Sequence, residues 1–405
     1  MSSTLLARQA IYDRDKNVHA YELLFRAHGD EVATITDGDH ATSTVLLNAF
    51  SALPVEEILE NKPAFVNFTR KLLDSPPPID ATRLVVEILE DIVVDDAMID
   101  AVRALKTQGF TIALDDYVYV DGHQALIELA DLIKVDVLAQ SLEQVRALLG
   151  RLGNFRGKLL AEKVETQAMF DACKELGFEL FQGYFLARPQ IVKGRTLESD
   201  QRTVLQLLSA LCNPAAEFRD IAQIIQTDSV LALKMLRLVN SALFNQRREI
   251  TSVRQAVTIL GMEKVRSWAH LLSLTKLDNQ PEALFVTTMV RARFGQLLAE
   301  RARAAALQGE SQFTIGLLST LDAFLGMELE DILGSISVPD SMRAAILQHR
   351  GNDGLIHTVT LAYERAELDS IDWPGLGALG IGAEQAQAAY LESLQWAQTN
   401  IELLH

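Results

Sequence analysis

The chain has 405 residues, 49% of them hydrophobic, and a formal net charge of −17 at pH 7. This length predicts two or three domains, and the charge argues against a nucleic-acid-binding surface, which needs clustered lysine and arginine. No run of about 18 uncharged apolar residues occurs, so we expect no membrane span. Because the first residues lack a secretory signal and the only cysteines are Cys173 and Cys212, we expect a cytoplasmic protein with reduced thiols.

Residues 1–193 alternate short apolar runs, each long enough for one buried strand, with stretches that suit helices. This pattern predicts an α/β barrel of parallel strands, in which the residues at the strand ends face one common mouth. Polar side chains end these runs: Glu22, Asn67, Glu87, Asp115, Asp116, Lys134 and Glu162. Carboxylates gathered at a mouth repel one another unless cations balance them. The pattern therefore predicts a site for a divalent metal and a phosphoester.

Residues 194–405 show helical periodicity almost throughout. Thr251 or Ser252 can cap a helix, and Gly261 is placed to end it. Residues 229–240 are apolar on nearly all sides, which favours a helix at the centre of a bundle. The second half is therefore predicted to be an all-α domain.

The motifs of the first half follow the order of a known family: YELLFR, FVNF, VEILE, LDD, IKVD, AEKVE and QGYFLARP, over about residues 5–190. In this respect the chain resembles the EAL domain, the family of cyclic di-GMP phosphodiesterases and their degenerate relatives. The resemblance implies a TIM-like barrel, magnesium or manganese as a cofactor, and cyclic di-GMP as a ligand.

The resemblance also implies a role for each matching position. The positions that match metal ligands are Glu22, Asn67, Glu87 and Asp115 for one ion, and Asp115 and Asp116 for a second. Lys134 matches a lysine that helps to activate water, and Arg26 matches an arginine that grips a ligand phosphate. The positions that complete or steady the site are Glu90, Glu162, Glu165 and Gln182. The alternative for each carboxylate is a salt-bridged or solvated remnant on a packed scaffold.

Two departures from the family pattern bear on catalysis. The residues after Asp116 are Tyr-Val-Tyr-Val, where active family members have Phe-Gly-Thr-Gly, and the interval to Lys134 is about two residues shorter than usual. Bulky residues do not readily adopt the positive φ angles that glycine permits, so this loop must follow another path. Lys163 also replaces a glycine, and its charge could compete with a metal.

The second half resembles the HDOD domain, a relative of the HD-GYP phosphodiesterases that lacks their metal ligands. The resemblance lies in IIQTDSVLALKMLRLVNSALF and ITSVRQAVTILGMEKVRSWA. An HD-type metal site needs an adjacent His-Asp pair, and the sequence contains none; Ser319 and Thr320 stand in its place. His270 and His349 are read as partly buried polar residues and not as metal ligands. This half is interpreted as an interaction module for a protein partner.

The leading hypothesis is a signalling protein whose EAL-like barrel binds cyclic di-GMP without efficient turnover, while the HDOD domain contacts a protein partner. One alternative is an active metal-dependent phosphodiesterase that yields the linear dinucleotide. A second alternative is a scaffold that binds no nucleotide. The resemblance also implies a possible homodimer, because barrels of this family often pair through the loop after Asp116. Since that loop is altered here, the sequence leaves the oligomeric state open.

Overall fold

The computed structural model describes residues 3–28, 59–76, 80–90, 92–120, 122–153, 155–183, 199–213, 215–227, 229–240, 250–275, 277, 281–304 and 307–401. The chain forms two compact units, one built mainly from Met1–Ala187 and the other mainly from the residues that follow. The boundary predicted between residues 193 and 194 lies outside the described residues. No helix in the described ranges combines enough length and apolar character to cross a bilayer.

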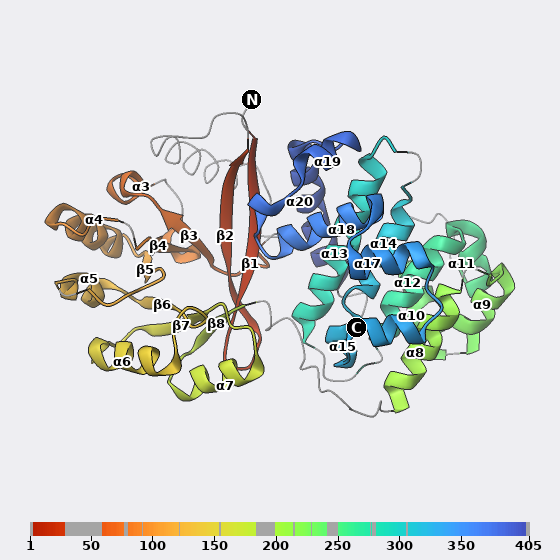
Figure 1. Cartoon of the computed structure of the whole chain (residues 1–405), viewed down its shortest axis with the longest axis horizontal. Coiled ribbons are helices and arrows are strands. Elements are labelled where there is room, and N and C mark those ends of the chain that lie inside the picture. The colour runs from red at the N-terminus through yellow and green to blue at the C-terminus, as the bar shows by residue number, and fades with distance from the viewer. Residues whose placement is uncertain are drawn as a thin grey trace. The chain divides into compact units, whose positions relative to one another are not determined.

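The first unit is a closed eight-stranded barrel in which the strands follow one another in chain order, as Figure 1 shows. The strands are β1 (Ser3–Tyr12), β2 (Val18–His28), β3 (Ala64–Phe68), β4 (Leu84–Ile88), β5 (Thr111–Leu114), β6 (Leu132–Asp136), β7 (Lys158–Glu162) and β8 (Leu180–Gln182). The predicted TIM-like barrel is confirmed, with one difference: β1 runs antiparallel to both β2 and β8. The reason is the short connection between β1 and β2, because a connection of a few residues can join only antiparallel strands.

Helices on the outer side of the strands cover the barrel (Figure 1). These helices are α3 (Arg70–Asp74), α4 (Asp96–Thr107), α5 (Gln124–Leu129), α6 (Leu142–Leu152) and α7 (Gln167–Glu175), with one 3₁₀ turn at Ala81–Arg83. Local sequence starts them: the Ser141 hydroxyl accepts a hydrogen bond from the Gln144 backbone at the beginning of α6, and Asp95 caps α4 in the same way.

One ring of apolar side chains crosses the inside of the barrel, with one residue from each strand. Its members are Ile11, Ala20, Phe65, Val85, Ala113, Leu132, Leu160 and Leu180. Because side chains alternate between the two faces of a strand, the residues two positions further along β2 to β8 also point inward. Those positions form the next layer toward the barrel mouth.

The second unit is helical, and no strand occurs in its described residues. Its α-helices are α8 (Ser199–Cys212), α9 (Phe218–Thr227), α10 (Ser229–Val239), α11 (Val253–Leu260), α12 (Met262–Leu274), α13 (Glu282–Arg301), α14 (Gly309–Leu318), α15 (Leu321–Leu325), α16 (Leu329–Ser335), α17 (Asp340–Gln348), α18 (Gly351–Glu364), α19 (Trp373–Ala378) and α20 (Ala383–Asn400), and a 3₁₀ turn lies at Leu368–Ser370. The predicted all-α domain is confirmed. Ser252 caps α11, and Gly261 ends it at φ 89°.

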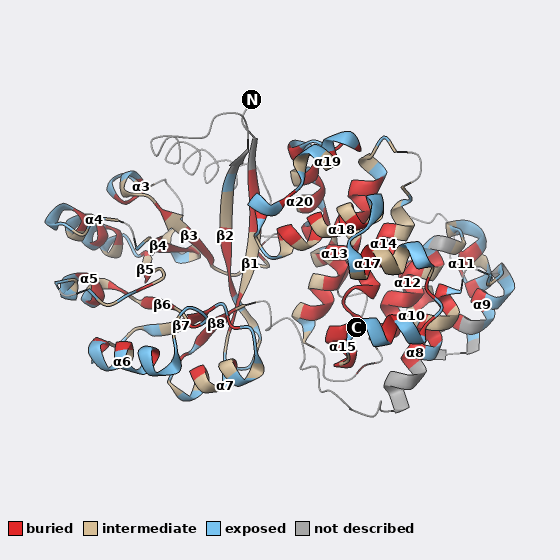
Figure 2. Cartoon of the chain, viewed as in Figure 1, coloured by how far each residue is buried: buried red, intermediate tan, exposed pale blue. Residues whose placement is uncertain are grey.

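The helix at the centre of this unit is not the one predicted. Residues 229–240 form α10, but its Leu233 is 53% exposed. Buried side chains instead lie along almost the whole of α13, which Figure 2 shows in red. The neighbouring helices do not cover all the apolar side chains of α10. Hydrophobicity alone therefore did not identify the central helix.

Candidate functional site

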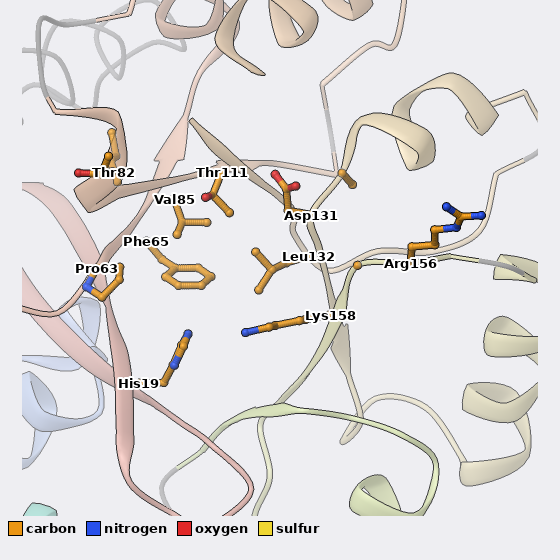
Figure 3. Close-up of a pocket in the computed structure, with 13 residues that line it drawn as sticks. His19, Pro63, Phe65, Thr82, Val85, Thr111, Asp131, Leu132, Arg156 and Lys158 are labelled. Carbon is orange, nitrogen blue, oxygen red and sulfur yellow. The ribbon is translucent and has the colours of Figure 1, made fainter. Parts of the chain in front are cut away.

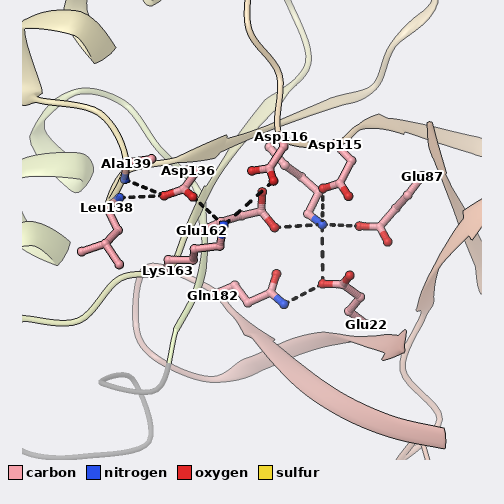
Figure 4. Close-up of polar contacts among 11 residues, drawn as sticks. Glu22, Glu87, Asp115, Asp116, Asp136, Leu138, Ala139, Glu162, Lys163 and Gln182 are labelled. Carbon is pink, nitrogen blue, oxygen red and sulfur yellow. Dashed lines mark hydrogen bonds and ion pairs between the residues drawn. The ribbon is translucent and has the colours of Figure 1, made fainter. Parts of the chain in front are cut away.

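The predicted polar residues lie together in the layer above the apolar ring. Glu22, Glu87 and Glu162 each stand two positions after a ring residue on their strands, and so do Asn67, Lys134 and Gln182. Asp115 holds the same position just beyond the end of β5. The strand period therefore places these side chains at one level of the barrel, as Figure 4 shows for those that it labels.

Lys134 is the centre of this layer and is fully buried. Its Nζ lies 2.6 Å from Glu87 Oε1 and 2.7 Å from Asp115 Oδ1. The same atom lies 3.0 Å from Glu162 Oε1 and 3.5 Å from Glu22 Oε2. One ammonium group thus contacts four carboxylates in a region with little access to water. We name these five residues the lysine–carboxylate cluster.

Electrostatics in the cluster follow from its burial. Burial alone would lower the pKa of Lys134, but the four carboxylates, Glu87 foremost, outweigh it and raise this pKa well above its ordinary value. Burial raises the pKa of Glu162 to about 8, although Lys134 opposes the shift. Burial and the neighbouring Glu22 likewise raise the pKa of Glu87. The cluster therefore keeps its ammonium, while Glu87 and Glu162 accept protons more readily than exposed carboxylates would.

Gln182 orients one member of the cluster. Its Nε2 donates to Glu22 Oε2 at 2.6 Å and to Gln9 Oε1 at 2.7 Å. Gln9 was missed in the sequence. It faces inward because β1 is antiparallel, so its place in the layer is two residues before the ring residue Ile11 and not two residues after it.

A second ion pair lies beside the cluster. Lys163 Nζ is 2.5 Å from Asp136 Oδ2 and 3.9 Å from Asp116 Oδ2 (Figure 4). Asp136 was also missed, although it stands two residues after Lys134 in the IKVD motif. Asp116 and Lys163 both have positive φ angles, 40° and 56°, which are uncommon for residues other than glycine and are concentrated at functional sites. Lys163 thus sets a cation next to a predicted metal ligand.

The altered segment after Asp116 begins inside the barrel and ends at its surface. Tyr117 is buried, and its backbone N–H donates to the Lys134 carbonyl at 3.0 Å. The next residues turn outward, with Val118 66% and Val120 46% exposed. The backbone hydrogen bond of Tyr117 therefore fixes the position of the adjacent Asp116 relative to Lys134.

The remaining predicted site residues lie outside the buried cluster. Arg26, Glu90 and Glu165 are exposed, the first on β2 and the other two in the turns that follow β4 and β7. No contact in the described structure places them on the cluster. Their roles as phosphate-binding, loop-steadying and site-completing residues stay predictions.

The oxygen atoms of the predicted metal ligands can be compared with the needs of the magnesium or manganese that the sequence suggests. Apart from the oxygens that pair with Lys134, the side chains of this layer and Asp116 have five buried oxygens without a hydrogen-bond donor among the described residues: Asn67 Oδ1, Glu87 Oε2, Asp116 Oδ1, Glu162 Oε2 and Gln182 Oε1. Oxygen donors of this kind suit hard divalent cations. Yet no three His, Cys, Asp or Glu side chains in the described ranges are arranged to hold a metal ion. The chemistry fits such an ion, while the arrangement surrounds an ammonium group.

In the helical unit, hydroxyl and guanidinium groups fill the place of the missing His-Asp pair. Arg291 donates from one guanidinium nitrogen to the carbonyl and hydroxyl of Ser319 at 3.0 and 2.9 Å. Thr288 donates to the Thr320 hydroxyl at 3.1 Å. These buried groups bind one another and offer no set of metal ligands.

The two singled-out histidines differ from the prediction in their burial. His270 is fully buried, and its Nε2 lies 3.4 Å from Cys212 Sγ. His349 is exposed, and it ends α17 in the left-handed conformation with φ 54°. Neither belongs to a metal-binding group among the described residues.

Comparison with known proteins agrees with this architecture. Residues 22–189 match the EAL domain family, and residues 197–330 match the HDOD domain family. The chain is 32% identical over 409 residues to the Bacillus subtilis (strain 168) protein named uncharacterized protein YuxH, a match that covers 96% of this chain and 97% of the relative. It is 31% identical to the Vibrio cholerae protein named cyclic di-GMP phosphodiesterase CdgJ, with 98% and 93% covered.

Two solved structures are also similar. The Bacillus subtilis YkuI protein, which has an EAL domain and was solved with cyclic di-GMP and calcium, is 19% identical with a TM-score of 0.37, covering 55% of this chain and 72% of that one. Klebsiella pneumoniae BlrP1 with manganese and cyclic di-GMP is 22% identical with a TM-score of 0.38, covering 45% and 58%. From its two domains and its full-length relatives, the chain belongs to the family of proteins in which an EAL domain is followed by an HDOD domain.

Proposed function

We propose that this protein is a cyclic di-GMP receptor whose barrel binds the nucleotide at the mouth but hydrolyses it inefficiently. The observation that carries this proposal is that Lys163, which stands where the family pattern has a glycine, lies beside Asp116, one of the carboxylates that a two-metal site would use. Lys134 contacts Glu22, Glu87, Asp115 and Glu162 in the buried cluster.

A divalent metal, magnesium or manganese, would be held by the oxygens of Glu22, Asn67, Glu87, Asp115 and Asp116. When bound, such ions neutralise phosphate charge and lower the pKa of a coordinated water. The rest of the site acts through the chain itself. Gln182 holds the Glu22 carboxylate in place by the hydrogen bond at 2.6 Å, and Arg26 is the residue proposed to pair with a ligand phosphate.

Inefficient turnover follows from the demand of two-metal chemistry for exact placement, in which an error of 1 Å is costly. The Lys163 charge disfavours a second cation at Asp116. The segment that continues from Asp116 is bound to the Lys134 backbone through Tyr117 and then leaves the mouth, so it does not bring flexible glycines to the site. Binding requires fewer of these constraints than hydrolysis does.

A second candidate is an active phosphodiesterase that yields the linear dinucleotide. It is favoured by the match to a named cyclic di-GMP phosphodiesterase over nearly the whole chain and by retention of every predicted metal-ligand position. A third candidate, a scaffold that binds no nucleotide, is favoured only by the ion-paired state of the carboxylates.

The helical unit is proposed to pass the state of the barrel to a protein partner. The support is that the place of the His-Asp pair holds Ser319 and Thr320, which are hydrogen-bonded to other buried groups. A cytoplasmic location and a homodimer belong to the same proposal, and light scattering of the purified chain with and without nucleotide would test the homodimer.

Calorimetric titration of the full chain with cyclic di-GMP, in EDTA and in manganese, tests the proposal. We expect saturable binding that Glu22→Ala weakens at least tenfold. The matched control is Glu128→Ala, because Glu128 is an exposed carboxylate on α5 that contacts only the neighbouring Gln124 in the described structure. An absence of heat under both conditions would favour the scaffold. Binding followed by rapid conversion to the linear dinucleotide would favour the enzyme.

A further inference from the structure

A cavity of about 520 Å³ opens at the end of the barrel opposite the lysine–carboxylate cluster. The residues that line it come from the beginnings of β2 to β7 and from the turns before them. Along β7, Lys158 faces this cavity, Leu160 belongs to the apolar ring, and Glu162 belongs to the cluster. Four residues of strand correspond to about 13 Å. The ring therefore separates the cavity from the mouth.

Polar and apolar side chains line the cavity in about equal measure, and the apolar ones lie together on one part of its wall. Phe65, Val85 and Leu132 belong to the apolar ring and also line the cavity. Leu84 and Pro63 line it beside them. Its volume is in the range of pockets that hold small organic molecules. Figure 3 shows the Phe65 ring lying between the side chains that surround it.

One acidic residue of the cavity is already neutralised within the protein. The two carboxylate oxygens of Asp131 lie 2.5 and 2.6 Å from Lys106 Nζ, and one of them also accepts the backbone N–H of Ile112 at 2.9 Å. Asp131 therefore presents little uncompensated negative charge to a ligand.

Two side chains with nitrogen donors, Lys158 and His19, face the cavity. Lys158 and His19 point toward each other beside Phe65, whereas the guanidinium of Arg156 points away (Figure 3). In the part of the chain that the structure describes, no hydrogen bond or ion pair joins the Lys158 ammonium or the His19 ring to another side chain. A protein with a net charge of −17 thus carries two adjacent basic side chains at the rim of a pocket that has one apolar wall.

The surroundings of His19 agree with an anion-binding role. Burial lowers the pKa of His19, and the nearby charges of Lys158 and Lys62 lower it further, while Asp13 opposes them. An anion between His19 and Lys158 would offset the charge of Lys158 and accept hydrogen bonds from both side chains.

We propose that this cavity binds a small organic anion: a carboxylate or phosphate group lies between Lys158 and His19, and an apolar, preferably aromatic, body packs on Phe65, Val85 and Leu132. The inference is independent of the proposed function, because the apolar ring lies between the two sites. Charge-assisted hydrogen bonds at the rim fix the anionic group, and the wall supplies the affinity for the body.

The test is fluorescence titration of the full chain with the aromatic anion 8-anilinonaphthalene-1-sulfonate, followed by competition with 2-naphthoate and with uncharged 2-naphthalenemethanol. Lys158→Met is expected to weaken probe binding about tenfold, the effect of one charge-assisted hydrogen bond. His19→Gln is a second variant that weakens it in the same direction. Arg156→Met is the matched control and should change the affinity less than twofold, since its guanidinium points away. 2-Naphthoate should compete, and 2-naphthalenemethanol should not.

Circular dichroism and a cooperative thermal transition must show that each variant is folded, because this probe also binds loosened cores. Equal affinity of the wild type and of folded Lys158→Met and His19→Gln variants overturns the proposal, and so does equal competition by the uncharged alcohol. Displacement of the probe by cyclic di-GMP, or its loss in Glu22→Gln, would assign the probe to the mouth and overturn the proposal in a different way. Failure of cyclic di-GMP to bind the mouth leaves these expectations unchanged.

Discussion

Replacing Lys163 with methionine should strengthen metal binding at the barrel mouth. The substitution removes the ammonium that lies 2.5 Å from Asp136 and 3.9 Å from Asp116. Methionine has a similar length and leaves the backbone requirement at φ 56° unchanged, whereas glycine would alter charge and backbone strain together. The change therefore isolates the effect of charge.

The expected size follows from Coulomb's law. A divalent ion held by Asp116 would lie about 2 Å beyond its carboxylate oxygen, hence roughly 6 Å from the Lys163 ammonium. At that separation the repulsion is about 1.4 kcal/mol in a water-like dielectric, and this is about tenfold in affinity. The water-like value is the appropriate one because the Lys163 side chain is 53% exposed.

Calorimetric titration with manganese at low salt measures this difference directly. Lys163→Met should bind manganese about tenfold more tightly than the wild type, and Lys163→Arg, which keeps the charge, should not. Added salt of about 0.5 M should reduce the difference, because the groups are partly exposed. Equal manganese affinity for the wild type and Lys163→Met would refute the reasoning that Lys163 competes with a metal.

Three further predictions concern buried ionisable groups. Lys134→Met leaves its carboxylate partners uncompensated, so scanning calorimetry in EDTA should show a barrel destabilised by about 3–5 kcal/mol, with partial recovery in manganese; an unchanged transition argues against the cluster. Because the raised pKa of Glu162, about 8, keeps its carboxyl protonated in the folded state, wild-type stability should fall from about pH 4.5 toward 8, and Glu162→Gln should lack this slope in urea melts; parallel slopes would count against it. Burial lowers the pKa of His270 to about 3, so only the unfolded chain takes up its proton below about pH 6.5, and the helical unit should lose about 1.4 kcal/mol of stability for each pH unit below that value. His270→Met should flatten this slope as followed by fluorescence of the three tryptophans, all of which lie in this unit, and an identical acid response in both proteins would contradict it.

The barrel layer could be predicted because it depends on strand period alone. Glu87 and Glu162 follow apolar residues at the spacing that points both inward, and the same spacing holds for Lys134. The ion pairs among these side chains could not be predicted from the sequence. That Lys134 would lie among four carboxylates depends on how its side chain crosses the barrel, which the sequence pattern does not encode. Gln9 could not be assigned without knowing that its strand runs antiparallel.

The cavity at the base of the barrel was not predicted for a related reason. Its apolar wall consists of ordinary strand residues, such as Phe65 and Val85, whose sequence pattern is that of a filled core. An unfilled volume arises from the mismatch of side-chain sizes across several strands, and no single motif records it. The helical unit shows the same limit, since the hydrophobic α10 has an exposed Leu233 and the longer α13 is the more deeply buried helix.

The central claim is that the barrel mouth binds cyclic di-GMP and hydrolyses it inefficiently. The most direct measurement is to incubate the purified full chain with an equimolar amount of cyclic di-GMP and manganese, isolate the complex by rapid gel filtration, and identify the bound nucleotide by chromatography. The account predicts that the nucleotide co-elutes with the protein and is recovered in its intact cyclic form after many minutes. Recovery as the linear dinucleotide within seconds, or no co-elution at all, would contradict it.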